Sequence, residues 1–116
     1  MAEFISMNRN TDFRRLYMRG KSFIHPALVT YVMRNRAGIC RLGITTSKKI
    51  GNAVSRNRSR RVIRAAFCAL SCELSGQWDI VCVARSRTKW VKSTELEKIM
   101  RKQLMAAGVI RSGQNK

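Results

Sequence analysis

Residues 53–74 read AVSRNRSRRVIRAAFCALSCEL, and this stretch predicts the longest helix of the chain. In its second half, apolar residues recur at helical spacing and form one stripe, which can face a core. In its first half, arginines take their place. The helix therefore has one end that packs against the fold and one end that projects past it. The apolar stripe consists of Ile63, Ala66, Phe67, Leu70 and Leu74.

Segments with strand character lie on both sides of this helix. Residues 28–33 (LVTYVM) and 39–46 (ICRLGITT) are rich in β-branched and apolar residues, and a turn at 35–38 separates them. We expect them to pair as an antiparallel hairpin. After the helix, residues 80–84 (IVCVA) form a continuous apolar run. Such a run is typical of a central strand that is covered on both faces.

Two further helices are predicted near the ends of the chain. Residues 11–19 combine possible N-cap residues with apolar residues at helical spacing, and Gly20 follows them. The last helix is expected to be capped by Ser93 or Thr94, with Glu97 completing a possible capping box with Thr94, and to end at Gly108.

The order of elements is thus α-β-β-α-β-α, which predicts an α+β fold: a two-layer sandwich with helices over one small sheet. The chain has 116 residues, of which 45% are hydrophobic, enough for one modest core. We therefore expect a single domain over residues 1–116, with an ordered core at about 8–108 and loose ends.

Charge is the feature that most restricts the function. Lysine and arginine total 24 against 6 acidic residues, for a formal net charge of +18, and no acidic residue occurs between Asp12 and Glu73. Self-repulsion of this size opposes folding, and a bound polyanion would relieve it, so a nucleic acid is the expected partner. A membrane surface is the rival polyanion. The sequence shows neither a long hydrophobic span nor a signal peptide, so we expect a cytoplasmic protein without membrane contact.

The arginines of the predicted helix are placed to meet phosphates. At about 100° per residue, Arg56, Arg60 and Arg64 share one side, while Arg58 and Arg61 point elsewhere. Like charges this close repel one another, so phosphate contacts would stabilise this end of the helix. Alternatively, it is only a solvated basic surface. The residues predicted to contact RNA are Lys48, Lys49, Asn52, Arg56, Asn57, Arg58, Arg60, Arg61 and Arg64.

Aromatic residues indicate a second contact with nucleic acid. Phe13 and Tyr17 are four residues apart on one helix face, and Val29 and Tyr31 share one strand face. A cleft with aromatic walls and cationic edges can hold a single strand by stacking. The same residues would also suit the core, and the pattern leaves both interpretations open.

No catalytic group or metal site is indicated. The chain has one histidine and few, scattered acidic residues, and it lacks a glycine-rich nucleotide loop. Its four cysteines, Cys40, Cys68, Cys72 and Cys82, are interpreted as reduced core residues. Cys68 and Cys72 lack two further ligands at zinc-like spacing, so a metal site is the less favoured alternative.

Residues 48–61, KKIGNAVSRNRSRR, resemble the signature of the bacterial ribonuclease P protein family. The GNAVxRNR pattern within them is long and specific. The likeness continues at residues 12–13, 79–81 and 84–85, and it covers about residues 8–106.

The resemblance implies a function and a fold. Proteins of this family join a large catalytic RNA and help it to cut the 5′ leader from precursor tRNA, with Mg²⁺ at the active site of the RNA. The chain would then be a subunit of an endoribonuclease, with no catalytic side chains of its own and no required protein partner. The implied fold is the ribosomal protein S5 domain 2-like sandwich. It includes a left-handed β-α-β crossover where the usual rule predicts a right-handed one.

The resemblance also implies a leader-binding cleft. Tyr17 matches a cleft position but carries a hydroxyl where an apolar aromatic ring is common. The helix geometry adds a hypothesis, in which Arg56 and Arg60 hold the leader while Arg58 and Arg61 hold the catalytic RNA. The residues that match the cleft are Phe13, Tyr17, Val29, Tyr31, Arg56, Asn57 and Arg60.

Three other classes of protein compete with this interpretation. A ribosomal protein or general RNA chaperone shares the size and charge but would not discriminate precursor from mature tRNA. A DNA-binding protein is less favoured because no helix-turn-helix is evident. A protein-only nuclease is disfavoured because metal-binding carboxylates are lacking.

Overall fold

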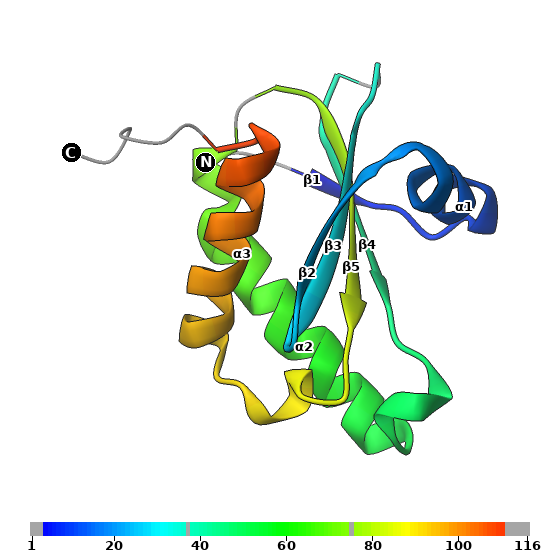
Figure 1. Cartoon of the computed structure of the whole chain (residues 1–116), viewed down its shortest axis with the longest axis vertical. Coiled ribbons are helices and arrows are strands. Elements are labelled where there is room, and N and C mark those ends of the chain that lie inside the picture. Colours follow the sequence, from blue (N-terminus) through cyan, green and yellow to red (C-terminus); the bar gives the residue numbers. More distant parts are fainter. Residues whose placement is uncertain (1–3, 37, 75, 111–116) are drawn as a thin grey trace.

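The computed structural model describes residues 4–36, 38–74 and 76–110, except for the side chain of Lys48 (Figure 1). Within them, five strands form one sheet and three α-helices pack on its two faces. The strands are β1 (Phe4–Ser6), β2 (Lys21–His25), β3 (Leu28–Arg34), β4 (Cys40–Thr45) and β5 (Trp78–Ala84). The helices are α1 (Asn10–Arg19), α2 (Ala53–Leu70) and α3 (Ser93–Ala107), with short 3-10 turns η1 (Lys48–Ile50), η2 (Ser71–Glu73) and η3 (Thr88–Trp90).

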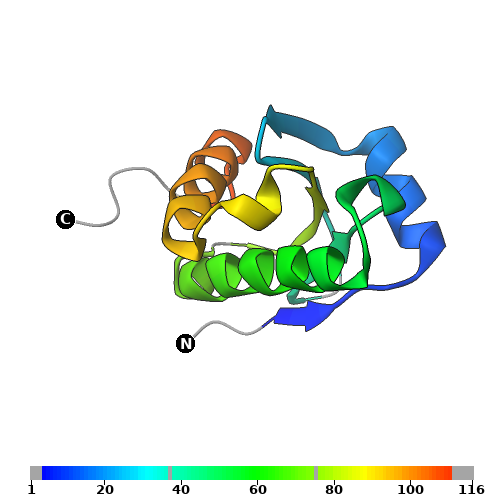
Figure 2. The same ribbon diagram turned by 90° about the horizontal axis from the view of Figure 1, so that it is seen from below.

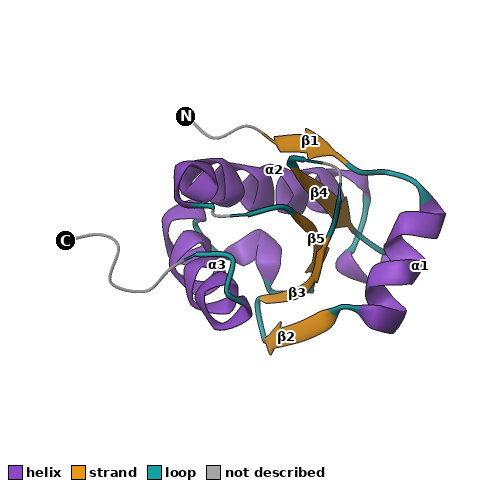
Figure 3. Ribbon diagram, turned by 90° about the horizontal axis from the view of Figure 1, so that it is seen from above, coloured by secondary structure: helices purple, strands orange, loops and turns teal. Residues whose placement is uncertain are grey.

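Strand β5 lies at the centre of the sheet, whose order is β1-β4-β5-β3-β2 (Figure 3). It pairs in parallel with β4 and antiparallel with β3. Ile80, Val81 and Cys82 are each 0% exposed. A strand that is apolar on both faces needs cover on both, and the prediction of a central strand at 80–84 is confirmed.

The predicted hairpin between residues 28–33 and 39–46 is wrong. Both segments form strands, but β5 is inserted between them, and β3 pairs instead with β2. That hairpin turns at Pro26 and Ala27, and the Ala27 amide donates to Nδ1 of His25 at 3.0 Å. Strand β2, KSFIH, escapes prediction because it is a short edge strand with polar, exposed positions. Local spacing favours pairing of successive strands, whereas the apolar faces of β5 decide the order.

Helices cover both faces of the sheet (Figure 2). Helices α2 and α3 pack together on one face over the main core, which includes Phe67 and Leu70. Helix α1 lies on the other face, where Leu16 joins Met7 and Val81 in a smaller cluster. The α+β class is confirmed, and α1 adds a partial third layer to the two that the sequence predicts.

Residues 4–6 belong to the sheet, although the sequence predicts a loose end there. Strand β1 pairs in parallel with β4, with Phe4 opposite Cys40. The ring of Phe4 meets the ring of Phe67 edge-on, with 4.8 Å between centroids. This contact with α2 holds the edge strand against the core. It joins residues that are far apart in the sequence, so the local pattern of residues 4–6 does not predict it.

The connection from β4 through α2 to β5 is left-handed, as the family resemblance implies. In Figures 1 and 3 the two parallel strands lie next to each other and α2 lies on one side of the sheet. When the sheet is viewed from that side with both strands pointing up, β5 lies to the left of β4. The general handedness rule for such connections predicts the opposite arrangement.

The helix ends follow the sequence predictions in part. Helix α2 ends at Leu70, four residues earlier than predicted, and continues as a 3-10 turn. Helix α3 has no side-chain cap at its N-terminus, so the predicted capping box of Thr94 and Glu97 is wrong. Glu97 instead accepts a 3.3 Å hydrogen bond from Arg101. Helix α3 does end at Gly108, which takes a left-handed conformation with φ of 86°.

None of the helices in the described part of the chain is long and apolar enough to span a bilayer.

A buried carboxylate, Asp79 of β5, joins α1 and β4 to the centre of the sheet. It is 0% exposed and accepts two 2.7 Å hydrogen bonds from the guanidinium of Arg41. Asn35 donates a third at 2.7 Å, and Arg15 of α1 lies 3.6 Å away. Burial acts to raise the pKa of Asp79, but the bonds from Arg41 and Asn35 and the nearby positive charges outweigh it, so the pKa is lowered. The carboxylate is therefore ionised at neutral pH.

Replacement Arg41→Met is expected to lower the free energy of unfolding at pH 7 by about 3 kcal/mol, because it leaves a buried carboxylate without its main partner. The native pKa of Asp79 lies below the unfolded one. Its contribution is therefore complete above the unfolded pKa of about 3.9 and is lost as the pH falls through the native pKa. The cost of Arg41→Met should shrink at about pH 3. Urea unfolding at both pH values measures it, and an equal cost at both would contradict this role of the ion pair.

The cysteines divide into two buried and two exposed thiols. Cys40 and Cys82 are buried, whereas Cys68 on α2 and Cys72 in η2 are exposed. The interpretation of all four as core residues is thus wrong for Cys68 and Cys72. Burial raises the pKa of the Cys82 thiol to about 12, against the opposing effect of a hydrogen bond with Thr30. Burial also raises the pKa of Cys40.

The native protein is expected to show two classes of thiol towards a disulfide reagent at pH 8. Cys68 and Cys72 should react quickly, while Cys40 and Cys82 should react only as fast as the protein opens. The double replacement of Cys68 and Cys72 by serine should remove the fast class. Absorbance of the released thiolate follows the reaction, with urea-unfolded protein as the reference. Four equally fast thiols in the native protein would contradict the described burial.

Candidate nucleic-acid interface

A cleft of about 530 Å³ lies on the sheet face that α1 covers only in part. It is bounded by α1, by the exposed side of β3 and β5, and by the η1 turn. Strand alternation explains its floor, because Val29 and Tyr31 of β3 face this side while their neighbours Leu28 and Thr30 face the main core. The residues that line the cleft are Tyr17, Val29, Tyr31, Ser47, Lys49, Ile50, Val83, Ala84, Arg85 and Ser86.

Two tyrosines form the aromatic part of the cleft. Tyr17 reaches down from α1 and meets Tyr31 of β3 edge-on, with 4.9 Å between ring centroids. Tyr17 is 42% exposed, so part of its ring remains available to a ligand. Val29 continues the floor and pairs across the sheet with Val83 of β5. The cleft thus offers ring edges and faces above an apolar floor, which suits unpaired bases.

Cations stand at the end of the cleft formed by η1 and the end of β5. Lys49 in η1 and Arg85 after β5 are both exposed, and among the residues that the structure describes no acidic one lines the cleft. The η1 turn is held in place from two sides. Lys89 donates to the carbonyl of Ile50 at 2.8 Å, and Arg56 donates to the carbonyl of Gly51 at 3.0 Å. Lys49 is therefore carried by a fixed loop.

Of the residues that the sequence assigns to the leader-binding cleft, the structure brings Tyr17, Val29 and Tyr31 together. Phe13 is not among the lining residues. It is half-buried in the smaller core beneath α1, where it lies against Gly43, at which a Cβ would collide with the Phe13 ring. The sequence left open whether the aromatic residues of α1 belong to the cleft or to the core. In the structure Tyr17 lines the cleft and Phe13 packs in the core. A leader contact by Phe13 stays a prediction.

The residues at the front of α2 lie next to the cleft rather than in its lining. Asn52 caps the helix, since its side chain accepts a 2.9 Å hydrogen bond from the Ser55 amide. Arg56 folds back on Gly51, as described above, while Asn57 is exposed. Their predicted contacts with RNA stay predictions. The side chain of Lys48, also predicted to contact RNA, lies outside the described part of the chain.

Three of the predicted arginines gather at a different place. Arg60, Arg61 and Arg64 border a hollow of about 250 Å³ beside β1 and β4, together with Met7 and Ile44 among others. Arg56 and Arg60 are one helical turn apart on α2, as predicted, but their side chains lie in different places. Arg56 contacts the carbonyl of Gly51, whereas Arg60 borders the hollow beside β1 and β4.

Arg58 points away from the cleft, as predicted. Its Nε donates to the carbonyl of Lys89 in η3 at 2.9 Å. It lines a groove of about 480 Å³ between α2 and the start of α3, which Arg61 also borders. The arginines of α2 therefore surround the front of the helix, and Arg61 links the two hollows.

Sequence reasoning missed the contribution of the chain around β5 to the cleft. Val83, Arg85 and Ser86 line it, as do Ser47 and Ile50 from the loop before α2. For Arg85 a signal was present, because a cation that directly follows a buried central strand must reach the surface at the end of that strand. The loop residues carry no such signal, since only tertiary contacts bring η1 to β5.

Comparisons with known proteins agree with this architecture. The family model described as Ribonuclease P matches residues 1–108. The ribonuclease P protein component of Clostridioides difficile (strain 630) is 37% identical over 93 residues, which cover 79% of this chain and 82% of that protein. The corresponding protein of Clostridium botulinum (strain Loch Maree / Type A3) is 35% identical over 104 residues, covering 89% and 94%.

Solved structures show the same relationship. The RNase P protein of Staphylococcus aureus has a TM-score of 0.79 and 33% identity, covering 91% of this chain and 97% of that chain. The RNase P protein of Thermotoga maritima has a TM-score of 0.76 at 24% identity, covering 87% and 96%, and shares the fold. The chain therefore belongs to the ribonuclease P protein component family, whose members serve tRNA 5′ processing as subunits of RNase P.

Proposed function

We propose that this subunit binds the catalytic RNA of RNase P and, in its cleft, the 5′ leader of precursor tRNA, and so assists endonucleolytic removal of the leader. The observation that carries the proposal is the cleft itself, with Tyr17 and Tyr31 along it and Lys49 and Arg85 at one end. Unpaired nucleotides would stack on the rings while their phosphates meet the cations. Stacking of this kind contributes about 1–3 kcal/mol per base.

The chemistry of cleavage is assigned to the RNA. The described residues that line the cleft include no aspartate, glutamate or histidine, which are the side chains that usually hold Mg²⁺ or transfer protons. Mg²⁺ would therefore be bound by phosphates of the catalytic RNA. The part of this chain would be to hold the leader in place and to raise the affinity of the holoenzyme for precursor over mature tRNA.

Two arginines of α2, Arg58 and Arg61, would serve the assembly with the catalytic RNA. Arg58 and Arg61 line the groove between α2 and α3, on the side of the sheet opposite α1. A net charge of +18 distributed on both sides of the sheet would let the protein bridge two RNA molecules. A general RNA chaperone needs no such division and would not respond to the leader.

Replacement Arg85→Ala is expected to weaken binding of a long-leader precursor tRNA to the holoenzyme about fivefold, because a charge-assisted contact with the leader is lost. Binding of mature tRNA and of the catalytic RNA should not change. Arg36→Ala is the matched control, since it removes an exposed arginine beyond the far end of β3. The measurement is the dissociation constant by filter binding in Ca²⁺. Equal losses for precursor and mature tRNA would contradict a leader contact.

The division of the α2 arginines is tested by comparing Arg58→Ala with Arg60→Ala. Arg58→Ala should weaken assembly with the catalytic RNA and leave the dependence on leader length intact. Arg60→Ala, which changes an arginine on the same side of the helix as Arg56, should weaken leader-dependent binding and leave assembly intact. Reconstitution of cleavage at low Mg²⁺, with protein and RNA titrated separately, measures both. If both variants weaken leader-dependent binding equally with assembly intact, the division is wrong.

A further inference from the structure

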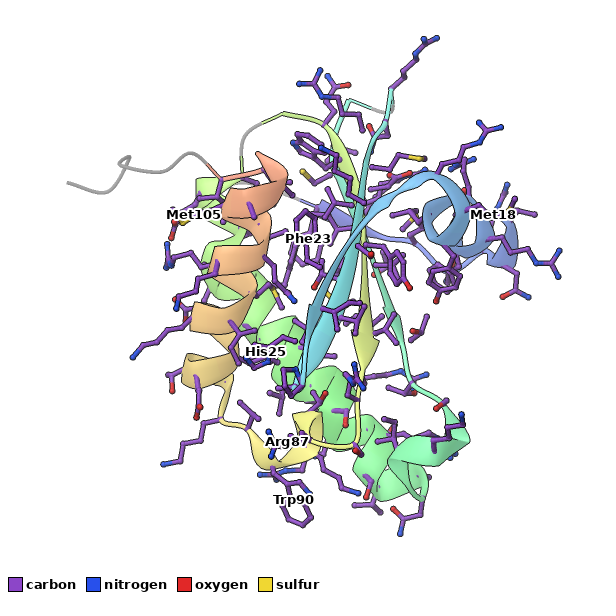
Figure 4. All side chains as sticks on the ribbon, in the orientation of Figure 1. Met18, Phe23, His25, Arg87, Trp90 and Met105 are labelled. Atoms are coloured by element: carbon purple, nitrogen blue, oxygen red, sulfur yellow. The ribbon has the colours of Figure 1, made fainter. Side chains whose placement is uncertain are left out.

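An exposed tryptophan stands at the end of the molecule, outside the cleft. Trp90 closes the η3 turn and is 79% exposed, although an indole is among the side chains with most to gain from burial. Figure 4 shows it projecting beyond the ribbon, with Arg87 close by. Neither the core nor the cleft uses it. It therefore needs a different explanation from the other aromatic residues.

The turn that carries Trp90 is anchored to the sheet. Thr88 is 0% exposed, and its hydroxyl donates to the carbonyl of Ala27 at 2.6 Å while accepting from the amide of Arg85 at 2.8 Å. The amide of Trp90 itself donates to the carbonyl of Arg87 at 3.0 Å. The backbone beneath the indole is thus held from inside the fold.

Two further bonds fix the same turn to its neighbours along the surface. The Lys89 ammonium reaches the carbonyl of Ile50, and the carbonyl of Lys89 accepts from Arg58 of α2. Nζ of Lys89 also lies over the Trp90 ring, 5.6 Å from its centroid, so one face of the indole carries a cation and the other is left for a base. A rigid aromatic ring in a basic surrounding loses little entropy when a ligand stacks on it.

A groove suited to a nucleic-acid backbone begins immediately after Trp90. Its floor is apolar, from Val62, Ala65 and Val91, and its cations are Arg58, Arg61 and Lys92, with no acidic residue among the lining residues of the described chain. Its volume is about 480 Å³. None of its lining residues lines the cleft that we assign to the leader.

We infer that Trp90 and this groove form a second single-strand site, in which an unpaired nucleotide of the catalytic RNA stacks on Trp90 and an adjacent phosphate lies among Arg58, Arg61 and Lys92. The inference rests on the proposed function and names the contact by which this subunit holds its RNA partner. Three features favour RNA: an exposed ring, a cationic rim, and a groove whose described lining residues include no acidic side chain. The catalytic RNA is favoured over the leader because the groove lies between α2 and α3, on the other side of the sheet from α1.

Replacement Trp90→Ala is expected to weaken the affinity of the protein for the catalytic RNA, measured without substrate, by at least about fivefold. Trp90→Tyr should restore most of the affinity, whereas Trp90→Leu, which keeps apolar area without a ring, should not. Met18→Ala is the matched control, because Met18 is 83% exposed on α1 and distant from η3 in Figure 4. The slope of affinity against salt should be the same for Trp90→Ala and the unchanged protein, since no phosphate contact is removed.

Fluorescence gives an independent readout. In a Trp78→Phe background Trp90 is the only indole, and stacking should quench its emission and protect it from acrylamide as the catalytic RNA is added. Unchanged affinity and unchanged emission would overturn the inference. So would an effect of Trp90→Ala that appears only with long-leader substrates, which would assign the ring to the leader.

The same series separates this inference from the proposed function. If the unchanged protein binds the catalytic RNA and supports leader-dependent cleavage while Trp90→Ala behaves identically, only the inference about Trp90 fails. If the unchanged protein does neither, the proposed function fails and the inference falls with it.

Discussion

The requirement to cover both faces of strand β5 determines most of this structure. Residues 80–82 are fully buried, so the strand cannot stand at an edge, and β3 and β4 must flank it. One face is covered by α2 and α3. The other is covered by α1 only in part, and the uncovered remainder of that face is the cleft. The same constraint that builds the core therefore also opens the surface on which the proposed function depends.

Sequence reasoning predicted the elements with a strong periodic signal and failed where tertiary contacts decide. The central strand, the apolar stripe of α2 and the stop at Gly108 are confirmed, because each follows from local chemistry. Strands β1 and β2 are short edges held by contacts such as Phe4 on Phe67, which no local pattern records. The left-handed crossover was available only through the family resemblance, since the general rule predicts the opposite hand.

The candidate site was predictable to a similar degree. Tyr17, Val29 and Tyr31 meet because helical and strand periodicity place them on facing surfaces, whereas Phe13, on the same helix face as Tyr17, packs against Gly43 instead. Arg85 enters the cleft because β5 ends there. The arginines of α2 surround a projecting helix end, as the excess of charge suggests, but their side chains divide between a loop carbonyl, a hollow beside β1 and the groove near η3. Side-chain direction at that scale depends on neighbours from distant parts of the chain.

We propose two RNA-binding surfaces on opposite sides of one sheet, and site-specific crosslinking tests this assignment most directly. A photoreactive nucleotide in the leader of precursor tRNA should label peptides that contain Tyr17, Tyr31 or Arg85 in the reconstituted holoenzyme. It should leave residues 90–94 and Arg58 unlabelled. Leader crosslinks at the groove between α2 and α3, with none in the cleft, would contradict the assignment of the two surfaces.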